Sequence, residues 1–111
     1  MTQQTFAYLI RPTRAEMLAE GHTPREEEIV SRHADYLAAF AEKRVIIFIG
    51  RTLTTDDSTF GIIVMKTADL QEAQSIVDDD PAVREGVMQA TLLPFKVVHM
   101  NPAQSEWFEL R

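Results

Sequence analysis

One histidine and one run of aspartates in this sequence have side chains that could transfer protons together. His33 lies within SRHADYLAAF, and three consecutive carboxylates, Asp78 to Asp80, lie within QSIVDDDPAVREGV. A histidine that acts as a general acid or base needs a carboxylate or carbonyl on its other ring nitrogen, because that partner fixes the tautomer. The DDDP corner could supply this carboxylate if both segments lie on the same face of the fold.

The pattern around His33 indicates that its side chain points toward the interior. On a helix with about 100° between successive residues, His33 falls in the middle of an apolar stripe. The stripe consists of Ile29, Val30, Tyr36, Leu37 and Phe40. A core histidine satisfied by one hydrogen bond would produce the same pattern, so this spacing leaves both interpretations open.

The three carboxylates stand where a helix is expected to end. Such an end is the negative pole of the helix dipole and disfavours further negative charge. Local conflicts of this kind are more common where a functional site requires them. The alternative is that Asp78 and Asp79 are simply solvated and that Asp80 is a turn residue before Pro81.

These segments belong to a predicted β-α-β-β-α-β order. We expect strands over residues 5–11, 45–50, 60–66 and 91–98, and helices over about 24–44 and 69–78, with shorter helical turns near 14–20 and 81–85. The sequence TPRE at residues 23–26 predicts a helix start, with a capping box and proline in the first turn. Crossovers of this length fit a split βαβ arrangement. The predicted fold is a ferredoxin-like α+β sandwich in one domain, 1–111, with a core over 5–98 and a tail over 99–111.

The predicted strands are apolar on both faces. VIIFI at residues 45–49 and IIVM at 62–65 do not alternate with polar residues, as a sheet with one solvated face should. Two helices cover only one face, so we expect a homodimer through the other, an isologous contact. The alternative is that the tail, which contains Trp107, Phe108 and Leu110, folds over that face.

Composition excludes several classes of function. A net charge of −6, from 11 basic and 17 acidic residues, argues against binding to nucleic acid or anionic membranes. The chain has no cysteine, and His22, His33 and His99 lie on different elements, so we expect no metal site. No phosphate-binding or dinucleotide fingerprint is present, so we expect no cofactor. No signal peptide or membrane span is predicted, and we expect a cytoplasmic protein.

Two stretches resemble the YCII-related (YciI-like) family of small bacterial proteins over roughly residues 5–98. SRHADYLAAFAEKRVIIFIG is similar to the family's histidine-containing helix that leads into a strand and a glycine. LQEAQSIVDDDPAVREGVMQATLLPFKVV is similar to its Glu-Ala, Asp-Pro, Gly-Val and strand-Pro-Phe signature. Gly50 is followed by Arg51 where proline is usual, Ala34 replaces a frequent leucine, and the loop after the first strand is long.

The resemblance implies a dimeric α+β barrel and a catalytic pair formed by His33 and Asp80. It also suggests elimination or isomerisation chemistry, since one relative is a dehydrochlorinase. Arg51 is the first candidate to bind a substrate carboxylate or phenolate, and Arg11 and Arg14 are weaker ones. Tyr36 is a further candidate in the substrate site. A solvated loop charge is the alternative for each arginine, and a packing role is the alternative for Tyr36.

Two functions of different class remain open at this point. The first is a small-molecule acid–base enzyme that uses His33 and Asp80. The second is a non-catalytic dimeric module that binds a small ligand or a partner protein. The enzyme hypothesis requires one ring nitrogen of His33 to face an open pocket, whereas the module hypothesis is compatible with a histidine sealed in the core.

Overall fold

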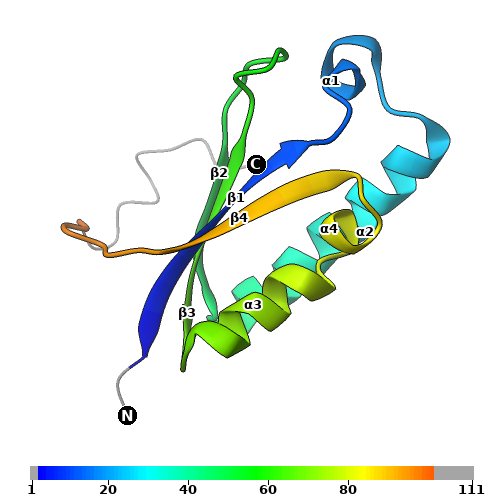
Figure 1. The fold of residues 1–111 in the computed structure, drawn as a ribbon. Helices are drawn as coiled ribbons and strands as arrows, with labels where there is room; N and C mark the ends of the chain where they lie inside the picture. The colour runs from blue at the N-terminus through cyan, green and yellow to red at the C-terminus, as the bar shows by residue number, and fades with distance from the viewer. Residues whose placement is uncertain (1–2, 102–111) are drawn as a thin grey trace.

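A four-stranded antiparallel sheet carries its helices on one face, as Figure 1 shows. The computed structural model describes residues 3–101. In chain order the elements are β1 (Gln4–Pro12), α1 (Glu16–Glu20), α2 (Pro24–Glu42), β2 (Ile46–Arg51), β3 (Gly61–Thr67), α3 (Leu70–Asp79), α4 (Pro81–Arg84) and β4 (Met88–Pro94). The strand order is β2-β3-β1-β4, which confirms the predicted α+β class and is consistent with a ferredoxin-like sandwich.

The starts of both long helices follow from local capping. At α2 the Thr23 hydroxyl accepts from the Glu26 N–H at 3.1 Å, and the Glu26 carboxylate accepts from the Thr23 N–H at 2.8 Å. This reciprocal pair is the predicted capping box. At α3 the Asp69 carboxylate accepts from the Glu72 N–H at 2.9 Å. Both contacts satisfy backbone donors that a helix leaves unpaired at its first turn.

The predicted bounds of the last strand were wrong. The sequence predicts residues 91–98, but β4 runs from Met88 to Pro94. Because proline has no N–H, the ladder with β1 cannot continue through it. One further bond joins the Phe95 N–H to the Thr5 carbonyl at 3.0 Å. Pro94 therefore ends the edge strand rather than interrupting it.

The core lies between the sheet and the helices. Phe6 pairs with Met65 and Tyr8 with Ile63 across the β1–β3 ladder. Paired residues project to the same face of a sheet, so these four point toward the helices. The buried residues of this core are Phe6, Tyr8, Ile10, Leu37, Ile46, Ile63, Met65, Ala73, Ile76 and Val77.

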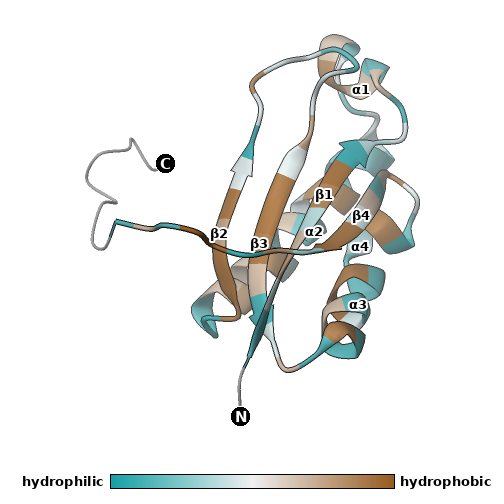
Figure 2. Cartoon of the chain, turned by 60° about the vertical axis from the view of Figure 1, so that its left-hand side comes forward, coloured by the Kyte–Doolittle hydropathy of each residue, from teal (hydrophilic) through white to brown (hydrophobic). Residues whose placement is uncertain are grey.

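The opposite sheet face is also apolar. Ala7 pairs with Val64 and with Leu93, and Val64 also pairs with Phe48, so these side chains share that face. Phe48 and Leu93 are nearly half exposed. Residues 95–101 extend from the end of β4 on the side away from the helices, as Figures 1 and 2 show. The tail residues Trp107, Phe108 and Leu110 lie outside the described residues.

Within residues 3–101 there is no helix with the length and apolar character needed to cross a bilayer.

Candidate functional site

The His33 ring contacts the Asp80 carboxylate inside the fold. Nδ1 of His33 lies 2.7 Å from Oδ1 and 2.9 Å from Oδ2 of Asp80. Asp80 is fully buried, and the His33 side chain is only 9 % exposed. An ionised carboxylate accepts hydrogen bonds and cannot donate them, so Nδ1 carries the hydrogen in this contact. Nε2 is then the free ring nitrogen, and within residues 3–101 it has no hydrogen-bond partner.

Asp80 takes its position from the junction between two helices. It is the first residue after α3 and the last residue before α4, with an extended backbone (φ −60°, ψ 122°) that Pro81 favours. Its Oδ1 also accepts from the Ala82 N–H at 3.0 Å, which caps α4. The two preceding carboxylates, Asp78 and Asp79, are exposed. Asp78 and Asp79 are therefore solvated. Asp80 is buried, and it is the carboxylate that contacts His33.

A third donor reaches the same carboxylate from the centre of the sheet. The Tyr8 hydroxyl donates to Oδ2 of Asp80 at 3.2 Å, and both side chains are fully buried. Burial, followed by the negative charge of Asp80, raises the pKa of the Tyr8 hydroxyl far above its usual range, so Tyr8 remains a donor. Burial of an ionised carboxylate is unfavourable unless it is paired and hydrogen-bonded. Three donors from β1, α2 and α4 meet this requirement.

His33 also forms part of the wall of a cavity of about 660 Å³. From α2, Val30, His33, Ala34 and Leu37 line it, and this i, i+3, i+4, i+7 spacing is one helix face. The cavity has 17 lining residues within the described chain, and most are apolar. Its volume is within the range of small-molecule sites, which are largely apolar with a few convergent polar groups.

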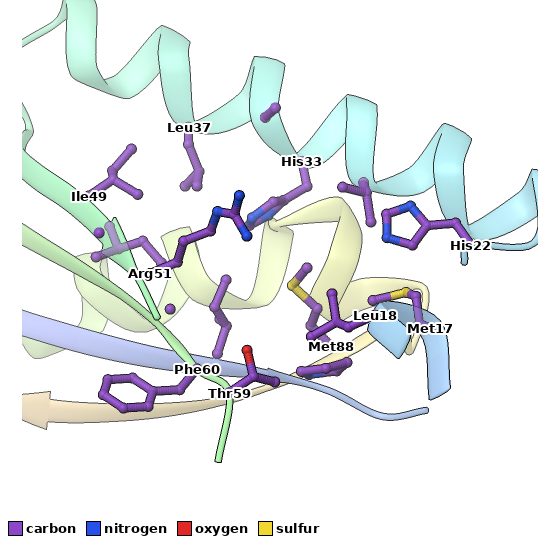
Figure 3. Close-up of a pocket in the computed structure, with 17 residues that line it drawn as sticks. Met17, Leu18, His22, His33, Leu37, Ile49, Arg51, Thr59, Phe60 and Met88 are labelled. Atoms are coloured by element: carbon purple, nitrogen blue, oxygen red, sulfur yellow. The ribbon is translucent and has the colours of Figure 1, made fainter. Parts of the chain in front are cut away.

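Four lining side chains are polar, namely His22, His33, Arg51 and Thr59. Figure 3 shows that the Arg51 side chain extends into the cavity toward His33. Arg51 is the last residue of β2 and forms no ion pair with any other described residue. A cation beside a histidine in an apolar cavity can bind an anionic group of a ligand.

The structure places the other three sequence candidates outside the cavity wall. Arg14 forms a two-pronged ion pair with Glu26, with Nε–Oε2 at 2.8 Å and Nη2–Oε1 at 2.6 Å. The Arg11 guanidinium lies 5.3 Å from the centre of the Phe60 ring, a cation–π contact. Arg14 and Arg11 therefore each contact a partner outside the cavity wall.

Tyr36 likewise has a structural role. Its hydroxyl donates to the Ile76 carbonyl at 2.7 Å, and its ring meets the Phe40 ring edge-on at 5.0 Å. Burial, together with Asp79 and Asp80, raises the pKa of Tyr36 to about 12. This side chain joins α2 to α3.

Sequence reasoning missed three residues around the site: Tyr8, His22 and Thr59. For Tyr8 a signal existed, because it shares a strand face with Phe6 and Ile10, and a buried tyrosine hydroxyl usually has a partner. Thr59 is buried, and its hydroxyl lies 3.2 Å from that of Thr52. His22 had been considered only as a metal ligand. Its place in the cavity depends on the fold of the loop before α2, which no local pattern predicts.

Among the described residues, no three histidine, aspartate or glutamate side chains come together as a metal-binding group. The polar lining residues are two histidines, an arginine and a threonine, a set that lacks the carboxylates or thiolates that usually complete such a site.

Several solved structures share this fold, among them the following two. An uncharacterised protein, TM1266 from Thermotoga maritima, matches with a TM-score of 0.56 and 12% identity, covering 86% of this chain and all of that one. The 5-chloro-2-hydroxyhydroquinone dehydrochlorinase TftG from Burkholderia phenoliruptrix AC1100, solved in complex with 2,5-dihydroxybenzoquinone, matches with a TM-score of 0.52 and 20% identity, covering 82% and 93%. At these identities the likeness shows the fold alone. No curated protein matches the chain.

The family assignment comes from the sequence itself. The profile of the YCII-related domain matches residues 5–96, a range that contains both the His33 helix and the Asp80 corner. The chain therefore belongs to the YCII-related domain family.

Proposed function

We propose that this protein is a small-molecule enzyme that uses His33 as a general acid and base, positioned by Asp80. The observation that carries the proposal is that His33 lies between two environments. Its Nδ1 is bound by a buried carboxylate, 2.7 Å away, while the ring forms part of the wall of a cavity. A histidine that served packing alone would have no need of an open cavity beside its ring.

The proposed chemistry begins with proton abstraction. Nε2 of His33 takes a proton from a C–H or O–H group of the bound substrate, and the Asp80 carboxylate stabilises the resulting imidazolium. The electron pair of a broken C–H bond forms a new double bond. In an isomerisation the imidazolium returns the proton at another atom, and in an elimination a leaving group departs with its own electron pair.

Arg51 would hold an anionic group of the substrate, a carboxylate or a phenolate, beside the imidazole. A cation in an apolar cavity stabilises negative charge that develops on the substrate more strongly than it would in water. The dehydrochlorinase that shares the fold supports the inclusion of phenolic compounds among candidate substrates, although its reaction is not transferred to this chain.

Deuterium exchange can test the proposal before the substrate is known. Small carboxylates, phenols and carbonyl compounds are incubated with the protein in D₂O, and loss of C–H signals is followed by proton NMR. We expect at least one compound to exchange in a protein-dependent manner, and His33→Gln or Asp80→Asn to lower that rate by about 10²–10⁴-fold.

His99→Gln is the matched control, because His99 is exposed and bonds Asn101 rather than lining the cavity. Exchange that persists in His33→Gln would refute the assignment of the base. Absence of exchange together with saturable ligand binding would favour the second candidate function, a non-catalytic ligand-binding module, which the largely apolar cavity also fits.

We also propose that two copies associate through the sheet face that carries no helices. Phe48 and Leu93 on this face are 46% and 43% exposed, and Val98, in the segment that extends beyond β4, is 87% exposed. Burial of apolar surface is the main driving force of such association. Sedimentation should show a dimer that Phe48→Glu converts to a monomer, and a monomeric wild type would refute this proposal.

A further inference from the structure

A second histidine shares the cavity with His33. His22 lies in the short connection between α1 and α2 and is a lining residue together with Met17 and Leu18 of α1. Figure 3 shows its ring directed into the cavity from the start of α2, with His33 between it and Arg51 in this view. Within residues 3–101 the His22 ring has no hydrogen-bond partner, so both its nitrogens are available to a ligand.

The connection that carries His22 is held by specific contacts. Arg14 bonds both carboxylate oxygens of Glu26, at the first turn of α2, and also donates to the Gly21 carbonyl at 3.1 Å. Met17 of α1 is 2% exposed, so α1 is anchored in a small apolar cluster with Ile29. The residues on both sides of His22 are thus fixed to the body of the protein.

The backbone at Gly21 contributes to the same placement. Its φ of 99° lies in a region that residues with a Cβ rarely adopt. A residue with a Cβ would therefore be strained at the position next to His22, which is exposed at the mouth of the cavity.

The spacing along α2 leaves room for a ligand between the two histidines. His33 lies nine positions after Pro24, the first residue of α2, which corresponds to about 14 Å of helix. The wall between them is formed by apolar side chains, including Val30 and Met17. A largely apolar ligand body fits such a wall better than a sugar would.

We infer that His22 is a specificity-determining residue that hydrogen-bonds a second polar group of the substrate, at the end opposite Arg51. This inference rests on the proposed function, because the reacting group must lie at His33, between the two ends. The substrate class is therefore a largely apolar compound with an anionic group at one end and a hydroxyl or carbonyl oxygen at the other. A hydrogen bond from His22 contributes only when that second oxygen is present.

Two matched pairs of probes test this. Dissociation constants are measured by NMR titration for benzoate against 4-hydroxybenzoate, and for phenylacetate against 4-hydroxyphenylacetate, which is longer by one methylene. We expect the hydroxyl to tighten binding roughly 3–10-fold in at least one pair. His22→Phe should abolish this preference while leaving the affinity of the parent acid within twofold, and His22→Gln should restore part of it.

The inference is overturned if neither hydroxylated probe binds more tightly, or if the preference survives in His22→Phe. Deuterium exchange tests the proposed function independently of the hydroxyl preference. His33→Gln should keep the hydroxyl preference and lose deuterium exchange. If the preference depends on His22 but the wild type catalyses no exchange, the binding assignment stands and the catalytic one fails.

Discussion

Replacement of Asp80 by asparagine should invert the tautomer of His33. The Oδ1 position lies 2.7 Å from Nδ1 of His33 and 3.0 Å from the Ala82 N–H. Both of these neighbours are donors, so the amide oxygen of the variant must occupy this position. The amide NH₂ then takes the Oδ2 position, 2.9 Å from Nδ1, where two donors face each other.

The least unfavourable solution is for His33 to move its hydrogen to Nε2. Nδ1 then accepts from the new amide, and the Tyr8 hydroxyl rotates to accept as well. Nε2–H faces the cavity as a donor and can no longer take a proton. The expected loss of proton-transfer rate is about 10²–10⁴-fold, the usual contribution of a positioned general base.

The stability change in this variant should be modest. Hydrogen bonds to a charged acceptor contribute about 1 kcal/mol more than neutral ones, and Asp80 accepts two short ones. Removal of a buried negative charge offsets part of that loss. We therefore expect the free energy of unfolding to fall by about 1–2 kcal/mol in urea titrations.

Nitrogen-15 spectra of the imidazole rings provide the assay. In the wild type, Nδ1 of His33 should be of the protonated, pyrrole type and Nε2 of the pyridine type, with the two exchanged in Asp80→Asn. His99, which is exposed, serves as the internal reference in each spectrum. An unchanged His33 tautomer with normal deuterium exchange would refute the reasoning that Asp80 positions the base.

Three other perturbations follow from the same contacts. Tyr8→Phe removes one long hydrogen bond of 3.2 Å and should lower the unfolding free energy by about 1 kcal/mol; a urea titration that shows no change would contradict its role. The ion pair with Arg14 lowers the pKa of Glu26 to about 2, so its stabilisation is complete above pH about 4.5 and is lost toward pH 2; Glu26→Gln should flatten that part of the melting-temperature profile. Gly61→Ala should lower the unfolding free energy, because its Cβ would lie 3.0 Å from the Ile10 side chain, whereas Gly50→Ala, with 3.9 Å to its nearest neighbour, is the control that should not lower it in the same urea titration.

Local signals predicted most of the fold. The TPRE start of α2, the Asp69 cap of α3 and the four apolar runs were sufficient to place the elements, because these features act over a few residues. The end of β4 was predicted wrongly, since proline can either interrupt an edge strand or terminate it. Which of the two occurs depends on whether the chain beyond it stays paired with β1, and that is a property of the sheet rather than of the segment.

The candidate site was predictable to a different extent. His33 had a periodic helical signal, and Asp80 had the unusual helix end and the family signature. No such signal told which arginine would line the cavity, because a charged residue at position 14 and one at position 51 look alike in sequence. Arg14 became a structural residue because the connection before α2 brings Glu26 to it, and Arg51 reached the cavity because β2 ends there.

The geometry of Asp80 couples stability to the proposed activity. One buried carboxylate accepts hydrogen bonds from β1 through Tyr8, from α2 through His33 and from α4 through Ala82. Any change at this residue therefore alters the packing of three elements as well as the tautomer of the ring. A loss of activity in Asp80→Asn is informative only if the protein remains folded, which the expected change of about 1–2 kcal/mol permits in a domain whose unfolding free energy is about 5–15 kcal/mol. By contrast, Asp80→Ala would leave a cavity and remove the acceptor of three buried donors, and we expect it to unfold a large fraction of the chain rather than to report on catalysis.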